Sequence, residues 1–402
     1  RSSSAGERRS LKRDVLVSAQ VAMAFALVIC AGLMTRSFRY LQSVDPGFEA
    51  GHRLTMRLTL PLHKYETDER RATFVEQAIR AIRGIPGVTS AATVSSLPLS
   101  GMNTWYDITI DGHTPARPDE RISAGYIVAT PGYFETMGIP LLRGRDFTFQ
   151  DTLESRHVVI VSENLASRFW PNEDPIGKRL KYGAPDSDAQ WRTVIGVTGD
   201  VKHAGVEREA RLETYRPYAQ TPWQFVVVIA QTQGDPAAAT SAVQQTIWDL
   251  DPDLALYRVR TMEDVVFHRH GVWGVYATLL GVFAAIALLI AAVGLYGVMA
   301  YSVSQRVHEI GIRMALGAQA PHVLRLVVTR SAIMALVGVA VGTALALALG
   351  SALRAIMYGI SPADPLTFLA VGSVMLVAAL LAGFMPARRA TRVDPAVALR
   401  CE

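Results

Sequence analysis

Three charged residues at helical spacing, Arg306, Glu309 and Arg313, form the most informative chemical pattern in the chain. Their spacing of i, i+3 and i+7 puts them on one helical face, and Glu309 and Arg313 also make an i,i+4 pair. Gly317 suits the position that ends such a helix. The apolar residues share a second face: Val307, Ile310 and Met314. The pattern fits a helix that docks into a partner's groove, and equally an interfacial helix that only joins two membrane spans.

Other reactive patterns are missing from the sequence. It contains no G-x-S-x-G, H-E-x-x-H or phosphate-loop motif. Residues 177–179, Gly-Lys-Arg, lack both the upstream glycine and the Ser/Thr of a phosphate loop. Cys30 and Cys401 are too few for a disulfide framework. His268 and His270 are interpreted as residues at a membrane interface rather than as metal ligands. We therefore predict no catalytic, cofactor-binding or metal-binding residues, and no enzymatic activity in this chain.

Composition identifies the elements that must position the 306–317 helix. Half of the 402 residues are apolar, only 19% are charged, and the mean hydropathy is +0.22. These values favour a membrane protein with a large aqueous part over a soluble enzyme or a disordered chain. The excess positive charge borders the hydrophobic runs instead of forming a stripe on a folded domain, so we predict no nucleic-acid binding.

Four runs without Asp, Glu, Lys or Arg are long enough to span a bilayer: residues 15–35, 271–305, 331–353 and 365–387. The first run is longer than the apolar part of a signal peptide, which favours an uncleaved anchor. On the third run, Gly338 and Gly342 form a GxxxG motif that permits close helix approach. That motif serves either packing within this chain or a dimer contact.

Basic residues predict the orientation of these spans. Residues 1–14, 306–330 and 388–402 together hold 13 basic and 5 acidic residues. We predict that these three pieces are a cytoplasmic N-terminal segment, a cytoplasmic loop and a cytoplasmic tail. The segments on the other side of the membrane are then the large domain of residues 36–270 and the short loop of residues 354–364.

The large domain mixes strand and helix patterns, which predicts an α+β fold. Alternating or β-rich runs predict strands near residues 53–60, 88–94, 106–110, 122–129, 158–161, 193–197 and 225–230. Helical spacing predicts helices over residues 68–83, 162–170 and 235–250, with Ser162 as an N-cap. We expect two lobes, one from residues 50–95 joined to 210–265 and the other from residues 96–210. The predicted fold class is four transmembrane α-helices with a large α+β extracytoplasmic domain between helices 1 and 2.

Several motifs resemble those of FtsX-like, MacB-type ABC transporter permeases. The coupling-helix signature of that family is similar to the run EIGIRMALGA at residues 309–318. Its C-terminal tail is similar to residues 386–400, and its periplasmic core domain to residues 130–145. The span layout is also the family's, and the chain resembles the second half of a duplicated, acidobacterial-type orphan permease.

The resemblance implies how the chain works. A separate ABC-type ATPase would bind ATP, so the chain itself would need no cofactor. The ATPase contacts would be Arg306, Glu309, Ile310, Gly311, Arg313 and Gly317. Motion of this helix would reach the periplasmic domain by mechanotransmission and drive export. The other expected partners are a second permease half, as a homodimer or a fused or duplicated half, and the lipid bilayer.

The implied location is the bacterial cytoplasmic membrane. An alternative function stays open at this point: a transmembrane regulator of a cell-envelope enzyme, or a sensor, without transport.

Overall fold

The computed structural model describes residues 3–101, 104–113, 121–206, 208–305, 320–352, 354 and 357–390. The chain divides into two compact units. One, the membrane unit, consists of residues 1–43 and 271–402, and the other, the inserted unit, consists of residues 44–270. The inserted unit therefore interrupts the membrane unit after its first helix.

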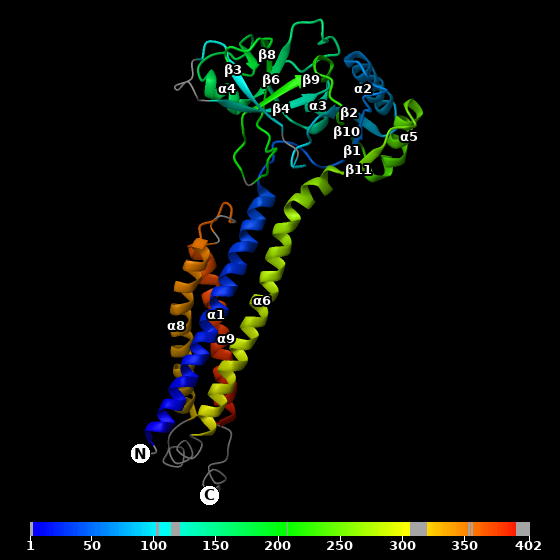
Figure 1. Ribbon diagram of the computed structural model, residues 1–402. Helices are drawn as coiled ribbons and strands as arrows, with labels where there is room; N and C mark the ends of the chain where they lie inside the picture. Colours follow the sequence, from blue (N-terminus) through cyan, green and yellow to red (C-terminus); the bar gives the residue numbers. More distant parts are fainter. Residues whose placement is uncertain are drawn as a thin grey trace. The chain divides into compact units, whose positions relative to one another are not determined.

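Four long helices form the membrane unit (Figure 1): α1 (Ser3–Ser43), α6 (Met262–Ser304), α8 (Ala320–Ala352) and α9 (Pro365–Ala390). Each contains a stretch long and apolar enough to cross a membrane: Arg13–Ser43, Gly274–Ser304, Val328–Ala352 and Pro365–Pro386. At 1.5 Å per residue, even the 22 residues of the last stretch reach across a core of about 30 Å. The predicted order, one apolar helix before the large domain and three after it, is confirmed.

Helix α1 is the most enclosed of the four. Half of the residues in its most apolar window are buried, against 17% in the corresponding window of α6. Phe25, Ile29 and Leu33 of α1 are almost completely buried, and they share one hydrophobic core with residues of α6, α8 and α9. The membrane unit is therefore built around α1 (Figure 1).

The first lobe of the inserted unit has βαββαβ topology. Its strands pair antiparallel in the order β11–β1–β10–β2. The bounds are β1 (Arg53–Thr59), α2 (Asp68–Arg83), β2 (Val88–Val94), β10 (Phe225–Thr232), α5 (Thr240–Leu250) and β11 (Leu256–Thr261). Apolar residues of α2 and α5 bury themselves against those of β1 and β10. The side chain of Thr67 caps α2 by accepting from the Arg70 N–H, as Thr commonly does at this position.

The second lobe closes a ring of six strands in the order β4–β3–β7–β8–β6–β9, and β9 returns to pair with β4. The bounds are β3 (Trp105–Ile110), β4 (Ile122–Ala129), β6 (Val158–Ser162), β7 (Arg179–Tyr182), β8 (Arg192–Thr198) and β9 (Glu213–Pro217). Three short elements complete the lobe: α3 (Tyr133–Met137), β5 (Leu141–Gly144) and α4 (Glu163–Phe169). Two 3-10 turns occur among the described residues of the unit: η1 (Tyr218–Gln220) and η2 (Pro236–Ala239).

The predicted strands and helices of the inserted unit are all present, including the N-cap at Ser162, whose hydroxyl accepts from the Leu165 N–H. The two predicted lobes are also present, with one boundary wrong. Residues 210–265 were assigned together to the first lobe, but β9 pairs with β4 and β6 in the second. Strand β9 lies in the second lobe because it pairs in parallel with β4, which is 88 positions away in sequence.

Candidate transmission site

The predicted ATPase contacts lie outside the described residues, because Arg306, Glu309, Ile310, Gly311, Arg313 and Gly317 all belong to residues 306–319. The described chain stops at Gln305, after the last turn of α6, and resumes at Ala320, the first residue of α8. Any force on residues 306–319 is therefore passed to the C-terminal end of α6 and to the N-terminal end of α8.

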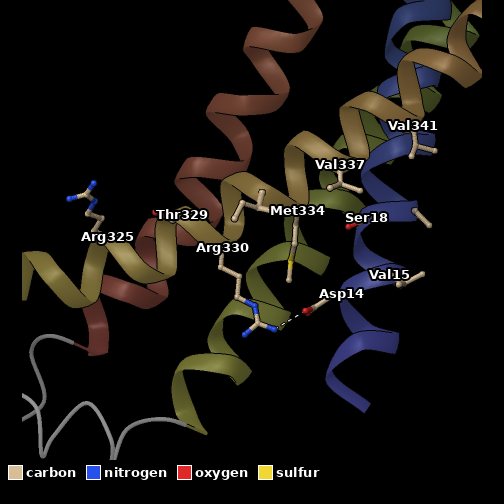
Figure 2. Close-up of a pocket in the computed structure, with 11 residues that line it drawn as sticks. Asp14, Val15, Ser18, Arg325, Thr329, Arg330, Met334, Val337 and Val341 are labelled. Carbon is tan, nitrogen blue, oxygen red and sulfur yellow. Dashed lines mark hydrogen bonds and ion pairs between the residues drawn. The ribbon is translucent and has the colours of Figure 1, made fainter. Parts of the chain in front are cut away.

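Arg330 of α8 connects this region to two other helices. Its guanidinium donates to the carboxylate of Asp14 on α1, with an N–O distance of 2.7 Å, and to the hydroxyl of Ser302 on α6 at 3.3 Å. Figure 2 shows the Arg330 side chain turned towards Asp14. The exposed fractions of the two charged side chains are 31% and 25%, so water screens the pair only in part. One arginine thus joins α1, α6 and α8.

A second contact joins α1 and α6 beside this ion pair. The guanidinium of Arg13 lies over the ring of Tyr301, 4.2 Å from the ring centroid, which is the geometry of a cation–π interaction. Arg13 precedes Asp14 in α1, and Tyr301 precedes Ser302 in α6. Together, the contacts of Arg330 and Arg13 join the N-terminal part of α1, the C-terminal end of α6 and α8 at one junction.

Close packing continues this junction along α8 and α1. A Cβ atom on Gly338 would lie 2.5 Å from Cγ1 of Val21, and one on Gly342 would lie 2.7 Å from the carbonyl oxygen of Ala22. Both distances are too short for a real side chain. The two glycines of the GxxxG motif therefore let α8 approach α1 of the same chain, which is the close approach that small residues allow in membranes.

At its opposite end, α1 contacts the start of α9 and the segment that precedes it. Arg36 of α1 forms an ion pair with Asp364, which lies just before α9, and donates to the Thr367 hydroxyl at 3.3 Å. Hydrogen bonds from Thr367 hold the pKa of Asp364 below its usual range. Ser37 accepts from the Tyr358 N–H at 2.8 Å and donates to the Tyr358 carbonyl at 3.1 Å. Helix α1 is thus fixed to its neighbours near both ends.

Residues 130–145, which resemble part of a periplasmic core domain, form a folding motif of the inserted unit. Tyr133, Phe134 and Met137 on α3 are almost completely buried. Gly144 has φ of +76°, and a Cβ there would meet the Ile195 carbonyl oxygen at 2.1 Å, so only glycine fits. The motif therefore positions core residues and a tight turn.

A buried polar cluster lies in the second lobe. The Tyr215 hydroxyl donates to the Glu213 carboxyl at 2.8 Å, and Nε2 of His203 lies 3.4 Å from the same carboxyl group. All three side chains are almost fully buried. Burial raises the pKa of Glu213 well above its usual range and lowers the pKa of His203 to about 3. Burial thus favours the uncharged form of both groups. This cluster could not be predicted from the sequence, because nothing in the local pattern marks Glu213 as buried.

Metal ligation has no support in the part of the chain that the structure describes, where no three His, Cys, Asp or Glu side chains are grouped to hold an ion. Nδ1 of His268 instead lies 2.7 Å from the backbone carbonyl of Asp264, one turn earlier in α6.

Comparisons with known proteins cover most of the chain. The family described as MacB-like periplasmic core domain matches residues 19–246, and the family described as FtsX-like permease C-terminal matches residues 281–395. An uncharacterized ABC transporter permease, YknZ of Bacillus subtilis strain 168, is 26% identical over 364 residues, which cover 86% of this chain and 85% of YknZ.

The macrolide export ATP-binding/permease protein MacB of Escherichia coli is 26% identical over 284 residues, which cover 67% of this chain and 42% of MacB. The match thus spans less than half the length of that relative. Among solved structures, the periplasmic region of MacB from Actinobacillus actinomycetemcomitans aligns with a TM-score of 0.37 and 14% identity, over 55% of this chain and 92% of that one.

Proposed function

This chain belongs to the MacB-type, FtsX-like family of ABC transporter permeases, and from that membership we propose that it is the membrane subunit of an exporter driven by a separate ATPase. It is a multi-pass membrane protein with four apolar helices. In the proposal, the partner subunit binds and hydrolyses ATP. The chain itself converts the resulting motion into movement of its inserted unit.

The observation that carries this proposal is the three-helix junction at Arg330. Residues 306–319 lie in sequence between the end of α6 and the start of α8. An ATPase that moves this segment pulls on both helices, and Arg330 transmits the pull to Asp14 of α1 through a charge-assisted hydrogen bond. The motion of one short segment thus reaches three helices at once.

Two of these helices are continuous in sequence with the inserted unit. Helix α1 ends at Ser43, immediately before that unit begins at Val44. Helix α6 begins at Met262, inside the unit, and continues through the membrane span to Ser304. A displacement at the Arg330 junction can therefore travel along α1 and α6 to the inserted unit. This mechanism needs no channel through the bilayer. We propose mechanotransmission of this kind as the mechanism of export.

The proposed location is the bacterial cytoplasmic membrane, with both termini and residues 306–330 in the cytoplasm. The distribution of basic residues around the spans supports this orientation. A second permease half, as a homodimer or a fused half, is the proposed partner for α6. The low burial of the α6 span supports this assignment, because most of its apolar surface is left for lipid or another subunit.

The proposal is tested by replacing Glu309 with Lys. Removing the charge partner of a docked side chain typically costs about 2–5 kcal/mol of binding, whereas loss of its i,i+4 pair costs only about 0.2–0.5 kcal/mol of stability. The tagged variant should reach the membrane at wild-type levels but fail to co-purify an ABC-type ATPase from the native host. Glu154→Lys, an equal charge change at an exposed position of the inserted unit, should retain the ATPase. Retention by Glu309→Lys as well would reject this contact.

A further inference from the structure

A groove of about 900 Å³ runs between α1 and α8 beside the Arg330 junction (Figure 2). On α8, every fourth residue lines it, in the order Arg325, Thr329, Ile333, Val337 and Val341. Residues four apart are neighbours on a helix surface, so these side chains form a continuous row that winds gradually around α8. On α1, the groove is lined by residues of the first membrane turns, Asp14, Val15, Ser18 and Ala19.

The row changes chemistry along its length. It starts with the cation of Arg325, continues with the hydroxyl of Thr329 and ends with three aliphatic side chains. Ile333, Val337 and Val341 have exposed fractions of 56%, 49% and 50%, so the aliphatic part is open to the surroundings. By the helical rise, the eight steps from residue 333 to residue 341 cover about 12 Å. That length is close to one leaflet of a hydrocarbon core about 30 Å thick.

The two arginines of the groove differ in their partners. Arg330 is held by Asp14, and Figure 2 shows the Arg325 side chain turned away from that pair. Arg325 is exposed, and no ion pair forms between it and any residue of the described part of the chain. A groove whose aliphatic wall ends at such a cation is complementary to a ligand with an acyl chain and an anionic head.

We propose that this groove binds an anionic phospholipid of the surrounding leaflet. Its phosphate contacts the guanidinium of Arg325, its glycerol region contacts Thr329, and an acyl chain lies along Ile333, Val337 and Val341. Basic pockets between membrane helices bind anionic lipid headgroups through the same chemistry. The bound lipid rests against the α1–α8 contact next to the Asp14–Arg330 pair. Lipid binding in this groove requires only that the helices lie in a membrane, and it does not depend on the partner ATPase.

A helix of a second copy fits the groove less well. The four apolar runs of this sequence contain no Asp or Glu, so a span of a second copy has no carboxylate to place against Arg325. A phospholipid supplies both the anion and the hydrocarbon from one molecule. Charge complementarity therefore favours the lipid.

The first test compares lipid headgroups by native mass spectrometry. Delipidated full chain is mixed with equal amounts of dioleoyl phosphatidylglycerol and dioleoyl phosphatidylcholine, which differ only in the headgroup. We expect about a fivefold preference for phosphatidylglycerol, which corresponds to about 1 kcal/mol for one basic contact. Arg325→Gln should abolish the preference. Arg13→Gln removes one charge from the same end of the helices, where Arg13 faces Tyr301, and should keep it.

The second test fills the groove without changing its charge. Val337→Trp should abolish the preference for phosphatidylglycerol, whereas Val293→Trp, at an exposed position of α6 outside the groove, should leave it intact. Equal binding of both lipids by the wild-type chain would overturn the proposal. So would an equal loss in Arg325→Gln and Arg13→Gln, which would indicate diffuse attraction. A preference that survives Val337→Trp, or a dimer that dissociates when the groove is filled, would assign the groove to another occupant.

Discussion

Arg330 and Asp14, 316 positions apart in the chain, form an ion pair that ties the helix after the proposed coupling segment to the first membrane helix. In the sequence, each residue is an ordinary charge at the end of a membrane span. Together, with Ser302 as the third member, they make α1, α6 and α8 respond to the same displacement. Substitutions of this pair are therefore a direct test of the proposed mechanism.

The Asp14–Arg330 pair should show coupling in a double-mutant cycle. Asp14→Asn and Arg330→Gln each remove one charge of this half-buried ion pair, so each should lower the free energy of unfolding by about 1 kcal/mol, the scale of interhelical hydrogen bonds in membranes. The double variant should lose clearly less than the sum of the two losses, because it leaves no unpaired charge. The measurement is denaturant unfolding of the full chain in detergent micelles. Strictly additive losses would show that the pair contributes nothing to stability.

Gly338→Ala and Gly372→Ala should change stability in opposite directions. A methyl group on Gly338 meets Val21 at 2.5 Å and the Ser18 carbonyl oxygen at 3.1 Å, so we expect a loss of about 1–3 kcal/mol from overpacking. A methyl group on Gly372 of α9 meets nothing within 4 Å, so there we expect a gain of up to about 1 kcal/mol from helix propensity. Thermal unfolding in the same detergent compares the two variants. A similar shift in both would contradict the assignment of Gly338 to the α1–α8 contact.

Much of the architecture could be predicted from the sequence, because membrane spans and long amphipathic elements are encoded locally. The apolar runs predict the four long helices, and helical spacing predicts α2. The strands that the sequence does not predict, β5, β7, β9 and β11, have only four to six residues each. Strand β9 even ends at Pro217, yet long-range pairing with β4 and β6 places it in the sheet.

The transmission site was predicted only in part. Position in the chain and resemblance pointed to residues 306–317, which lie outside the described residues, so their role remains a prediction. The partnership of Arg330, Asp14 and Ser302 could not be predicted, because it depends on how three helices rotate against one another. The GxxxG motif was visible, but only the structure gives the helix that it faces.

The buried Glu213 should make stability depend on pH above neutrality. Its folded-state pKa is raised by burial, so the folded chain keeps a proton that the unfolded chain, with a pKa of about 4.3, has released. The contribution of Glu213 to the free energy of unfolding is complete below the unfolded pKa and is lost as the pH rises through the folded pKa. His203 has the opposite slope, but only between its folded pKa of about 3 and its unfolded value of about 6.5. The free energy of unfolding should therefore fall from pH 7 upwards.

Glu213→Gln should remove that fall, because an amide keeps the acceptor for the Tyr215 hydroxyl and does not titrate. Urea unfolding between pH 7 and 9 is followed by tryptophan fluorescence, with a slope of up to about 1.4 kcal/mol per pH unit in the wild-type chain. The exposed Glu154→Gln serves as the control and should keep the wild-type slope. Parallel slopes in wild type and Glu213→Gln would show that Glu213 is already ionised in the folded state.

Single cysteines should report opposite sides of the membrane for the inserted unit and for the C-terminal end of α6. After Cys30→Ala and Cys401→Ser, Ala189→Cys places a thiol on the exposed surface of the inserted unit, and Gln305→Cys places one at the exposed end of α6. A membrane-impermeant maleimide added to intact spheroplasts should label position 189 and leave position 305 unlabelled until the membrane is opened by detergent. The reason is the concentration of basic residues on the side of the 306–330 loop, which favours retention of that loop in the cytoplasm. Labelling of position 305 in intact spheroplasts would place the proposed coupling segment out of reach of any cytoplasmic ATPase. The export mechanism would then fail at its first step, even with the Asp14–Arg330 junction intact.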